Sequence, residues 1–402
     1  MLEHIQSGPP DPMFVLKKIA DNDLSPGKVD LGVGIYRSEA GSYQELDVVK
    51  QVGVPLPPLN ISQYEQTTGD ADFLKLAAGV MFGDDSQALA CGKISSVQTI
   101  SGTGANSLGA LLIAKTMQPK PKVYIGIPTW GNHIPIFENV GLETSTYSYL
   151  DSTGHAVDLS AILNAVRTAP RGSVFVLQGC CHNPSGVDLS VNQWRELALE
   201  MKSYGHLPFF DTAYQGLGDG LDEDASGVRI FVDTGIEMFV CQSFSKNFAL
   251  YGERCGALHV VAGCTQVAAN VQDQLRSLIR HTYSSSPAYG SRLVKTVLKS
   301  PDLRAAWAME LEGMRKRLER NRSALHYHLT QVLGTPGNWD HLIKEKGLFS
   351  CLALSPFQCR ILIDTHHIYL PQSGRINIAG LSEANVGRAA EAIDKVVRLS
   401  GE

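Results

Sequence analysis

The chain has 402 residues, of which 44% are hydrophobic and 19% are charged, an ordinary composition for a globular protein large enough for two domains. Its net charge is −5 and it contains no run of like charges, which argues against a partner that is nucleic acid or a membrane surface. No stretch approaches the roughly 20 apolar residues that span a bilayer.

The N-terminal segment 1–12 has neither a basic region followed by an apolar run nor the pattern of a transit peptide, so we expect a cytoplasmic protein, with an organellar form as the alternative. The eight cysteines show no CxxC or zinc spacing and are predicted to be free, buried thiols. No histidine pair has carboxylates or cysteines at ligand spacing, so we expect no metal site.

Short apolar runs alternate with helical patterns through the middle of the chain, which predicts βαβ units and a mostly parallel sheet. The predicted strands are 96–100, 122–127, 174–177, 207–211, 238–241 and 257–261. The predicted helices are 106–116, 159–165, 191–204 and 265–280. Ligands of such sheets bind beyond the carboxyl ends of the strands, so the residues that follow each strand are the candidates for a site.

The C-terminal part has a different pattern. A long charged helix is predicted at 301–333, followed by short apolar segments near 347–351 and 375–379 and a closing helix from about 382. We expect a small α+β domain at 316–402, a large domain at 46–315, and an N-terminal arm at 1–45 that forms part of the small domain.

A glycine-rich turn, Ser-Gly-Thr-Gly-Ala-Asn at 101–106, follows the first predicted strand. Glycines such as Gly102 let backbone N–H groups approach an anion, the following helix adds the positive end of its dipole, and the Thr103 hydroxyl is a further ligand. Many turns of this kind are glycine-rich for geometry alone. The turn is neither a GxGxxG motif nor a P-loop.

Trp130, His133 and Asn183 follow the next two strands. Trp130 either packs in its loop or offers a flat surface to an aromatic ring. His133 is either a core histidine or lies behind Asp211 and orients it. Asn183 begins an Asn-Pro-Ser-Gly turn, and its amide can also donate a hydrogen bond to a ring oxygen.

Asp211 ends the predicted strand 207–211, where a helix N-cap is the usual role of an aspartate. If a pyridine cofactor binds, a carboxylate is needed there to keep the ring nitrogen protonated. Tyr214, three residues later, is then a donor to the phenolate oxygen of the ring.

Lys246 lies between Ser243 and Ser245, with Arg254 eight residues later. A lysine at a strand end can act as a covalent amine nucleophile, and serine hydroxyls and arginine are natural phosphate ligands. This pattern predicts an aldehyde cofactor that bears a phosphate and is held as a Schiff base. The alternative is a solvated lysine in a serine-rich turn.

Two further arginines stand out. Arg375 lies in an apolar strand and needs a partner, for which a carboxylate bound in bidentate fashion is the best candidate. The alternative is a structural ion pair. Arg280 ends a predicted helix before the serines at 284–286. The alternative to a binding role for Arg280 is that of a surface cation at a helix C-terminus.

Taken together, these segments resemble the class I, fold-type I pyridoxal-phosphate aminotransferases, most closely the aspartate and aromatic amino-acid subgroup, along essentially the whole chain. The matching segments are 11–14, 30–37, Tyr64, 102–104, 129–133, 182–184, 211–216, 243–248, 252–254, Arg280 and 374–380. The resemblance implies an α/β fold with a mostly parallel seven-stranded sheet flanked by helices in the large domain, and a smaller α+β domain.

The resemblance also implies the roles of the site residues. Lys246 holds the cofactor and then moves the proton, Asp211 pairs with the pyridine nitrogen, and Tyr214 binds the phenolic oxygen together with Asn183. Trp130 stacks on the ring and, like Asn183, lies beside the substrate. The implied phosphate ligands are Gly102, Thr103, Ser243, Ser245, Arg254 and, from the neighbouring subunit, Tyr64.

Arg375 is implied to grip the substrate α-carboxylate, Gly34 lies at the substrate mouth, and Arg280 of a neighbouring subunit binds the distal carboxylate, which makes the enzyme a homodimer. The implied reaction is the ping-pong conversion of L-aspartate and 2-oxoglutarate to oxaloacetate and L-glutamate. The alternative is a broad-specificity aromatic aminotransferase, because some relatives swing the distal arginine aside. A lyase or decarboxylase using the same cofactor is disfavoured by Arg375, and a non-catalytic scaffold by the intact cofactor residues.

This sequence departs from the family in several places, including Ile35 and Leu348, which vary in the shell around the substrate. Ser-Ser-Ser-Pro at 284–287 stands where relatives commonly have Ser-Asn-Pro-Pro, and Gln178 stands where many have histidine. These differences leave the side-chain specificity open.

Overall fold

The computed structural model describes residues 2–53 and 64–399 of the chain. Two compact units are present, one formed by 44–316 and the other by 1–43 together with 317–402. Among the described residues, no helix combines the length and the apolar character that a membrane crossing requires.

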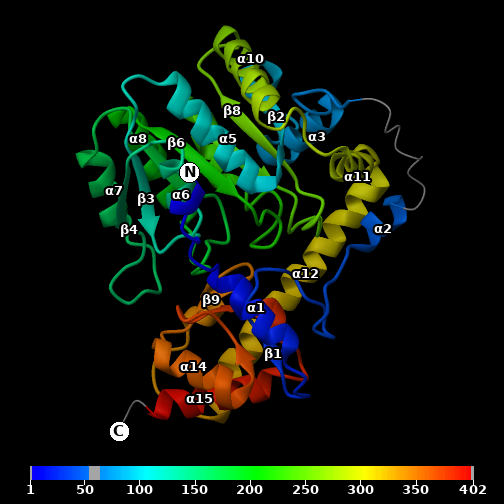
Figure 1. Ribbon diagram of the computed structural model, residues 1–402, viewed down its shortest axis with the longest axis vertical. Helices are drawn as coiled ribbons and strands as arrows, with labels where there is room; N and C mark the ends of the chain where they lie inside the picture. The colour runs from blue at the N-terminus through cyan, green and yellow to red at the C-terminus, as the bar shows by residue number, and fades with distance from the viewer. Residues whose placement is uncertain (1, 54–63, 400–402) are drawn as a thin grey trace. The chain divides into compact units, whose positions relative to one another are not determined.

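The larger unit is built on a seven-stranded sheet with the order β2-β8-β7-β6-β5-β3-β4. Figure 1 labels β2, β8, β6, β3 and β4 of this sheet. Its strands are β2 (Ile94–Ile100), β3 (Val123–Ile127), β4 (Thr144–Ser148), β5 (Val174–Gln178), β6 (Leu207–Thr212), β7 (Met238–Ser243) and β8 (Cys255–Val261). Strand β8 runs antiparallel to β2 and β7, and the other neighbours pair in parallel. The prediction of a mostly parallel sheet is confirmed.

All six predicted strands are present, each within three residues of its predicted limits. The seventh, β4, has the sequence Thr-Ser-Thr-Tyr-Ser and lies at the edge of the sheet. An edge strand with few apolar side chains has no apolar run, so the sequence pattern does not reveal it.

Helices cover both faces of this sheet. The helices described in this unit are α2 (Asp47–Gly53), α3 (Ala71–Phe82), α4 (Gln87–Ala90), α5 (Ser101–Thr116), α6 (His133–Glu138), α7 (Leu159–Thr168), α8 (Val191–Tyr204), α9 (Ser226–Asp233), α10 (Thr265–Thr282) and α11 (Ala288–Lys299). One apolar cluster joins the sheet to α7, α8 and α9, and a second joins it to α5, α6 and α10.

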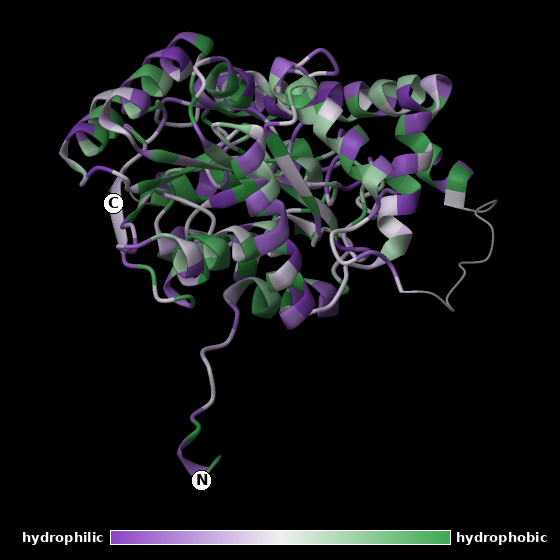
Figure 2. Cartoon of the chain, turned by 90° about the horizontal axis from the view of Figure 1, so that it is seen from above, coloured by the Kyte–Doolittle hydropathy of each residue, from purple (hydrophilic) through white to green (hydrophobic). Residues whose placement is uncertain are grey.

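Successive residues of one strand belong to different clusters, because side chains alternate along a strand. Phe210 packs in the first cluster and Phe209 in the second, and both are fully buried. Figure 2 shows the hydrophobic residues concentrated on these strands, whereas the covering helices carry both hydrophobic and hydrophilic residues. A sheet buried on both faces leaves its strand ends as the place for a site.

Helix α8 occupies its predicted range because both of its ends have local signals. Ser190 and Gln193 form a capping box at the start, and Gly205 takes the left-handed conformation that ends the helix. The predicted start of α5 at residue 106 is wrong, because the helix begins at Ser101. The glycines of the turn are therefore in the first turn of the helix itself.

The smaller unit has an α+β composition. Its strands are β1 (Val29–Asp30), β9 (Phe349–Cys351), β10 (Ile368–Tyr369) and β11 (Arg375–Asn377), with β1 parallel to β10 and β11 antiparallel to β9. Its helical elements are η1 (Leu2–His4), α1 (Pro12–Asn22), η2 (His328–Val332), α13 (His341–Lys344), α14 (Pro356–His366), η3 (Ile378–Gly380) and α15 (Val386–Arg398). The long helix α12 (Pro301–Tyr327) begins in the larger unit and ends in this one.

The eight cysteines are all free, as predicted. The prediction that they are buried is wrong for Cys91 and Cys264, which are exposed. Cys91 caps the C-terminus of α4 and Cys264 the N-terminus of α10, so both lie at turns and not inside strands.

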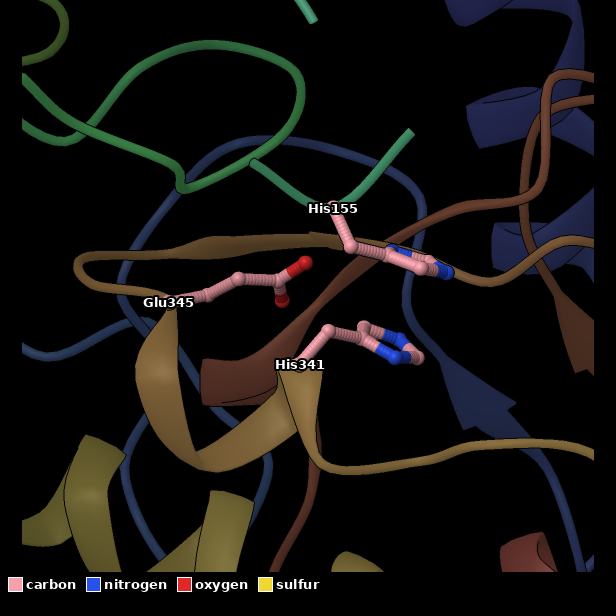
Figure 3. A group of neighbouring side chains, drawn as sticks. All are labelled: His155, His341 and Glu345. Atoms are coloured by element: carbon pink, nitrogen blue, oxygen red, sulfur yellow. The ribbon is translucent and has the colours of Figure 1, made fainter. Parts of the chain in front are cut away.

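A buried ion pair lies in the smaller unit. Arg322 of α12 lies 3.1 Å, from Nη1 to Oε2, from Glu345, which follows α13 and is drawn with His341 in Figure 3. Arg322 also donates to the carbonyl oxygens of Gly347 at 3.0 Å and Phe349 at 2.6 Å, and so fixes the start of β9. Burial raises the pKa of the Glu345 carboxyl to about 7, although Arg322 opposes this shift.

The ionisation of Glu345 predicts a pH-dependent stability. The unfolded chain releases the proton near pH 4.5 and the folded chain only near pH 7, so stability is lost as the pH rises between these values. Between pH 5 and pH 8, the free energy of unfolding of the wild type should fall by about 2 kcal/mol relative to that of Glu345→Gln. Urea denaturation of the cofactor-free proteins measures this, with the exposed Glu391→Gln as control. If the free energies of unfolding of the wild type and Glu345→Gln differed by the same amount at pH 5 and pH 8, the raised pKa of Glu345 would be contradicted.

Candidate active site

The predicted site residues of the larger unit lie after neighbouring strands of the sheet. Asp211 is in β6, with Gln178 of β5 opposite it on one side and Cys241 of β7 on the other. Asn183 follows β5, and Lys246 follows β7. Because β5, β6 and β7 are parallel neighbours, these side chains share the carboxyl edge of the sheet.

Asp211 is held from behind by a buried histidine. Its Oδ2 lies 3.0 Å from Nε2 of His133, which is fully buried, and Nδ1 of His133 lies 2.7 Å from Thr129 Oγ1. The hypothesis that His133 orients Asp211 is confirmed in its geometry. The helix N-cap interpretation of Asp211 is wrong, because the residue lies within β6 and the next helix, α9, starts only at Ser226.

Three hydroxyls and a guanidinium meet at the N-terminus of α5. Ser101 Oγ lies 2.7 Å from Ser245 Oγ and 3.1 Å from Ser243 Oγ, and Arg254 Nη1 donates to Ser245 Oγ at 3.1 Å. Burial lowers the pKa of Arg254, which nevertheless stays a cation because arginine does not lose its proton in proteins. Hydroxyls, a cation and a helix N-terminus together make an anion-binding set.

This set depends on a close approach of two backbones. A Cβ on Gly256 of β8 would lie 2.6 Å from the backbone carbon of Ser101 and 2.7 Å from the carbonyl oxygen of Gln242. Ser101 itself has a φ of 60°. A Cβ on Gly102 would lie 3.0 Å from Ser243 Cβ, so glycine also keeps the first turn of α5 open there.

Ser101 is a member of this set that the sequence alone does not single out. Its only sequence signal is its place between a strand and the glycines of the turn. Thr103, predicted as a ligand, lies in the same first turn of α5.

Lys246 lies beside Tyr214. Its Nζ is 4.8 Å from the centre of the Tyr214 ring, and Tyr214 is buried with 6% of its surface exposed. Lys246 is only partly exposed, which does not fit a solvated loop lysine. Trp130 meets the ring of His133 edge-on, with 5.3 Å between the ring centres.

Asn183 is also buried, with 6% of its surface exposed. Its peptide N–H donates to Oε1 of Gln178 at 2.8 Å, and its carbonyl oxygen accepts a hydrogen bond from Nε2 of Gln178 at 3.0 Å. The turn is thus fixed to the end of β5.

Gly34 and Arg375 belong to the smaller unit. Arg375 Nη2 donates to the carbonyl oxygen of Gly32 at 2.7 Å, and its guanidinium carbon lies 4.4 Å from the centre of the Phe349 ring. A Cβ on Gly34 would lie 2.6 Å from Cζ of the same ring. The ring thus packs against Gly34 and supports the guanidinium of Arg375.

Tyr64 and Arg280 do not contact the cluster around Lys246 within the described residues. Tyr64 is 93% exposed. Arg280 is exposed in the last turn of α10, where its Nη1 donates to the hydroxyl of Ser284. This position suits both a surface cation and a residue that reaches another subunit.

Pyridoxal phosphate fits the residues of the larger unit. The anion-binding set at α5 suits its phosphate, and the open turn at Gly102 leaves room for it. Asp211, held by His133, suits a protonated ring nitrogen. Lys246 supplies the amine that an aldehyde requires.

The family model of the class I and II aminotransferases matches residues 26–393. The chain is 44% identical to the aminotransferase tasG of Hapsidospora irregularis, over 98% of the chain and 96% of the relative. It is 42% identical to aspartate aminotransferase 1 of Medicago sativa, over 98% and 94%.

Solved structures agree over the whole fold. Aspartate aminotransferase from the cytoplasm of Saccharomyces cerevisiae superposes with a TM-score of 0.95 at 40% identity, over 99% of both chains. The aromatic-amino-acid aminotransferase of Burkholderia pseudomallei, covalently bound to pyridoxal phosphate, has a TM-score of 0.94 at 36% identity, again over 99% of both chains.

The anion-binding set predicts the effect of removing its cation. Hydrogen bonds to charged groups contribute about 1.5–3 kcal/mol, so Arg254→Met should raise the dissociation constant of pyridoxal phosphate about 10- to 100-fold. Cofactor titration followed by absorbance measures this. Arg276→Met, an exposed arginine of α10 paired with Asp273, is the control and should bind like the wild type. Equal affinity of both variants would contradict the assignment of Arg254.

Proposed function

Because the chain belongs to the class I and II aminotransferases, a family that depends on pyridoxal phosphate, we propose that it is an aspartate aminotransferase that converts L-aspartate and 2-oxoglutarate to oxaloacetate and L-glutamate. The observation that carries the chemistry is the buried pair of His133 and Asp211 at the sheet edge that also bears Lys246. The substrate class is supported by Arg280 and by relatives named aspartate aminotransferases at 38–42% identity.

In this proposal, each candidate site residue of the larger unit holds one part of the cofactor. Ser243, Ser245, Arg254, Gly102 and Thr103 bind the phosphate, with the Ser101 hydroxyl joining them through its bonds to the two serines. Trp130 stacks on the ring, and Tyr214 and Asn183 donate hydrogen bonds to the ring oxygen. Bound pyridoxal phosphate supplies an aldehyde that takes up an amino group and a ring that withdraws electrons.

Asp211 keeps the ring nitrogen protonated. Because an ionised carboxylate only accepts hydrogen bonds, Nε2 of His133 carries the proton of their 3.0 Å bond. Nδ1 is then free to accept the hydroxyl proton of Thr129 at 2.7 Å. This chain of two bonds fixes the position of Asp211.

Lys246 moves the proton of the reaction. With the cofactor bound, its Nζ would hold the cofactor and would become free when the substrate amine took its place. The free Nζ would then accept the proton from the substrate Cα and would deliver it to the carbon of the bound cofactor that had carried the aldehyde, which is general base and then general acid catalysis by one amine. Lys246 is partly exposed, so its Nζ can contact a bound substrate. The buried ring of Tyr214 beside it shields the amine from bulk water.

Two arginines select the substrate in this proposal. Arg375 binds the α-carboxylate in bidentate geometry, held in place by Gly32 and by the ring of Phe349. Arg280 binds the distal carboxylate in the site of a neighbouring subunit, and Tyr64 reaches the phosphate there. Tyr64 and Arg280 are exposed in the single chain, which supports a homodimer.

The second candidate is a broad-specificity aminotransferase for aromatic amino acids. It is favoured by the similarity to the aromatic enzyme of Burkholderia pseudomallei and to the broad-specificity aminotransferase of Leishmania mexicana, both with a TM-score of 0.94. A cytoplasmic location also stays a proposal, since named relatives include cytoplasmic, mitochondrial and chloroplastic forms.

Kinetics with two substrates test the specificity. We expect kcat/KM for aspartate to exceed that for tyrosine, and a ratio of one or below would contradict an aspartate enzyme. Leaving a bound carboxylate without its partner costs several kcal/mol, so Arg280→Leu should lower kcat/KM for aspartate about 100- to 1,000-fold. The value for tyrosine should change less than about tenfold, and Arg276→Leu should leave both unchanged. Equal losses for the two substrates would contradict the role of Arg280.

A further inference from the structure

Side chains hold the turn that carries Asn183. The peptide N–H of Cys181 donates to Oδ2 of Asp188 at 2.7 Å, and that of His182 to Oδ1 of Asp188 at 2.9 Å. The next peptide, that of Asn183, is bound on both sides by Gln178, with its N–H at 2.8 Å from Oε1 and its carbonyl oxygen at 3.0 Å from Nε2. Side chains thus bind the N–H groups of three consecutive residues that follow β5.

The residues before and after Asn183 are fixed by other contacts. The ring of His182 stacks on Tyr149 with 4.0 Å between the ring centres, and its Nδ1 lies 2.8 Å from Ser185 Oγ. These contacts fix the flanks of the turn. Gln178 is the residue that binds the Asn183 peptide itself.

Two opposite hydrogen bonds require a carboxamide, which carries both a donor and an acceptor at the end of one side chain. Together they fix the plane of the Asn183 peptide and not only its distance from the strand. A histidine at this position would have one nitrogen at each side of its ring and could not reproduce this pair. Gln178 also lies opposite Asp211 in the sheet, so it ties the turn to the strand pair that carries the carboxylate.

We infer that Gln178 is a positioning residue for Asn183, which directs the Asn183 amide toward the ring oxygen of the cofactor by fixing the Asn183 peptide. This inference rests on the proposed function, in which Asn183 donates a hydrogen bond to that oxygen. Such a bond stabilises the anionic form of the chromophore, so it lowers the pH midpoint of the visible absorbance of the loaded enzyme. An amide that is no longer fixed loses part of this effect.

Gln178→Met tests the inference. Methionine has a similar length without a comparable donor or acceptor, and its flexible side chain adapts to irregular surroundings. We expect the pH midpoint to rise by about half a pH unit to one pH unit, and the dissociation constant of pyridoxal phosphate to rise about three- to tenfold. Gln178→His, which keeps one of the two bonds, should give a smaller rise.

A double variant separates positioning from a general structural effect. If Gln178 acts through Asn183, Gln178→Met adds nothing to the rise in pH midpoint caused by Asn183→Ala. The matched control is Gln193→Met on α8, where a glutamine Oε1 also accepts a peptide N–H, that of Ser190, at 2.8 Å. This control should lower thermal stability and leave the pH midpoint unchanged.

The outcomes distinguish the inference from the function on which it rests. If Asn183→Ala leaves the midpoint unchanged, the proposed role of Asn183 is wrong and the inference fails with it. If Asn183→Ala shifts the midpoint and Gln178→Met does not, only the inference is wrong. Shifts that add in the double variant would also overturn it, because Gln178 would then act independently of Asn183.

Discussion

The hydrogen bond between Asp211 and His133 is the interaction on which the site depends. Burying a carboxylate costs several kcal/mol unless it is paired and hydrogen-bonded, and Asp211 is buried with 8% of its surface exposed. His133 and Thr129 provide that pairing from the loop after β3 and the start of α6. The sheet therefore holds this carboxyl group in place at its carboxyl edge, where the proposed function puts the ring nitrogen of the cofactor.

A second constraint acts beside it, at the contact of two backbones. Gly256 lets β8 pass within van der Waals distance of Ser101, and this contact places the first turn of α5 against the end of β7. The hydroxyls of Ser101, Ser243 and Ser245 meet there as a result. The absence of a Cβ at Gly256 thus allows the close packing of β8 against Ser101, and this packing brings the anion-binding set together. Asp211 and the anion-binding set lie on the same sheet, so in the proposed function one layer holds both ends of the cofactor.

Local patterns in the sequence predict the elements well where each end has its own signal. The box of Ser190 and Gln193 and the glycine at 205 bound α8 without tertiary information. The start of α5 is not predicted, because glycines that read as a loop form a helical turn once Gly256 allows the approach. The role of each site residue is harder still to predict from the sequence, because partners such as His133 and Asp211 are 78 residues apart in the chain.

Family resemblance names the residues but not how they are supported. The bonds from Gln178 to the Asn183 peptide and the part of Ser101 in the anion-binding set are visible only in three dimensions.

The central claim is that Lys246 moves the proton that converts an amino acid to a 2-oxo acid. The aspartate half-reaction without 2-oxo acid tests it most directly. The wild type should form pyridoxamine phosphate and one equivalent of oxaloacetate, whereas Lys246→Ala should be slower by at least about 10⁴-fold. An unchanged rate in Lys246→Ala would contradict the account.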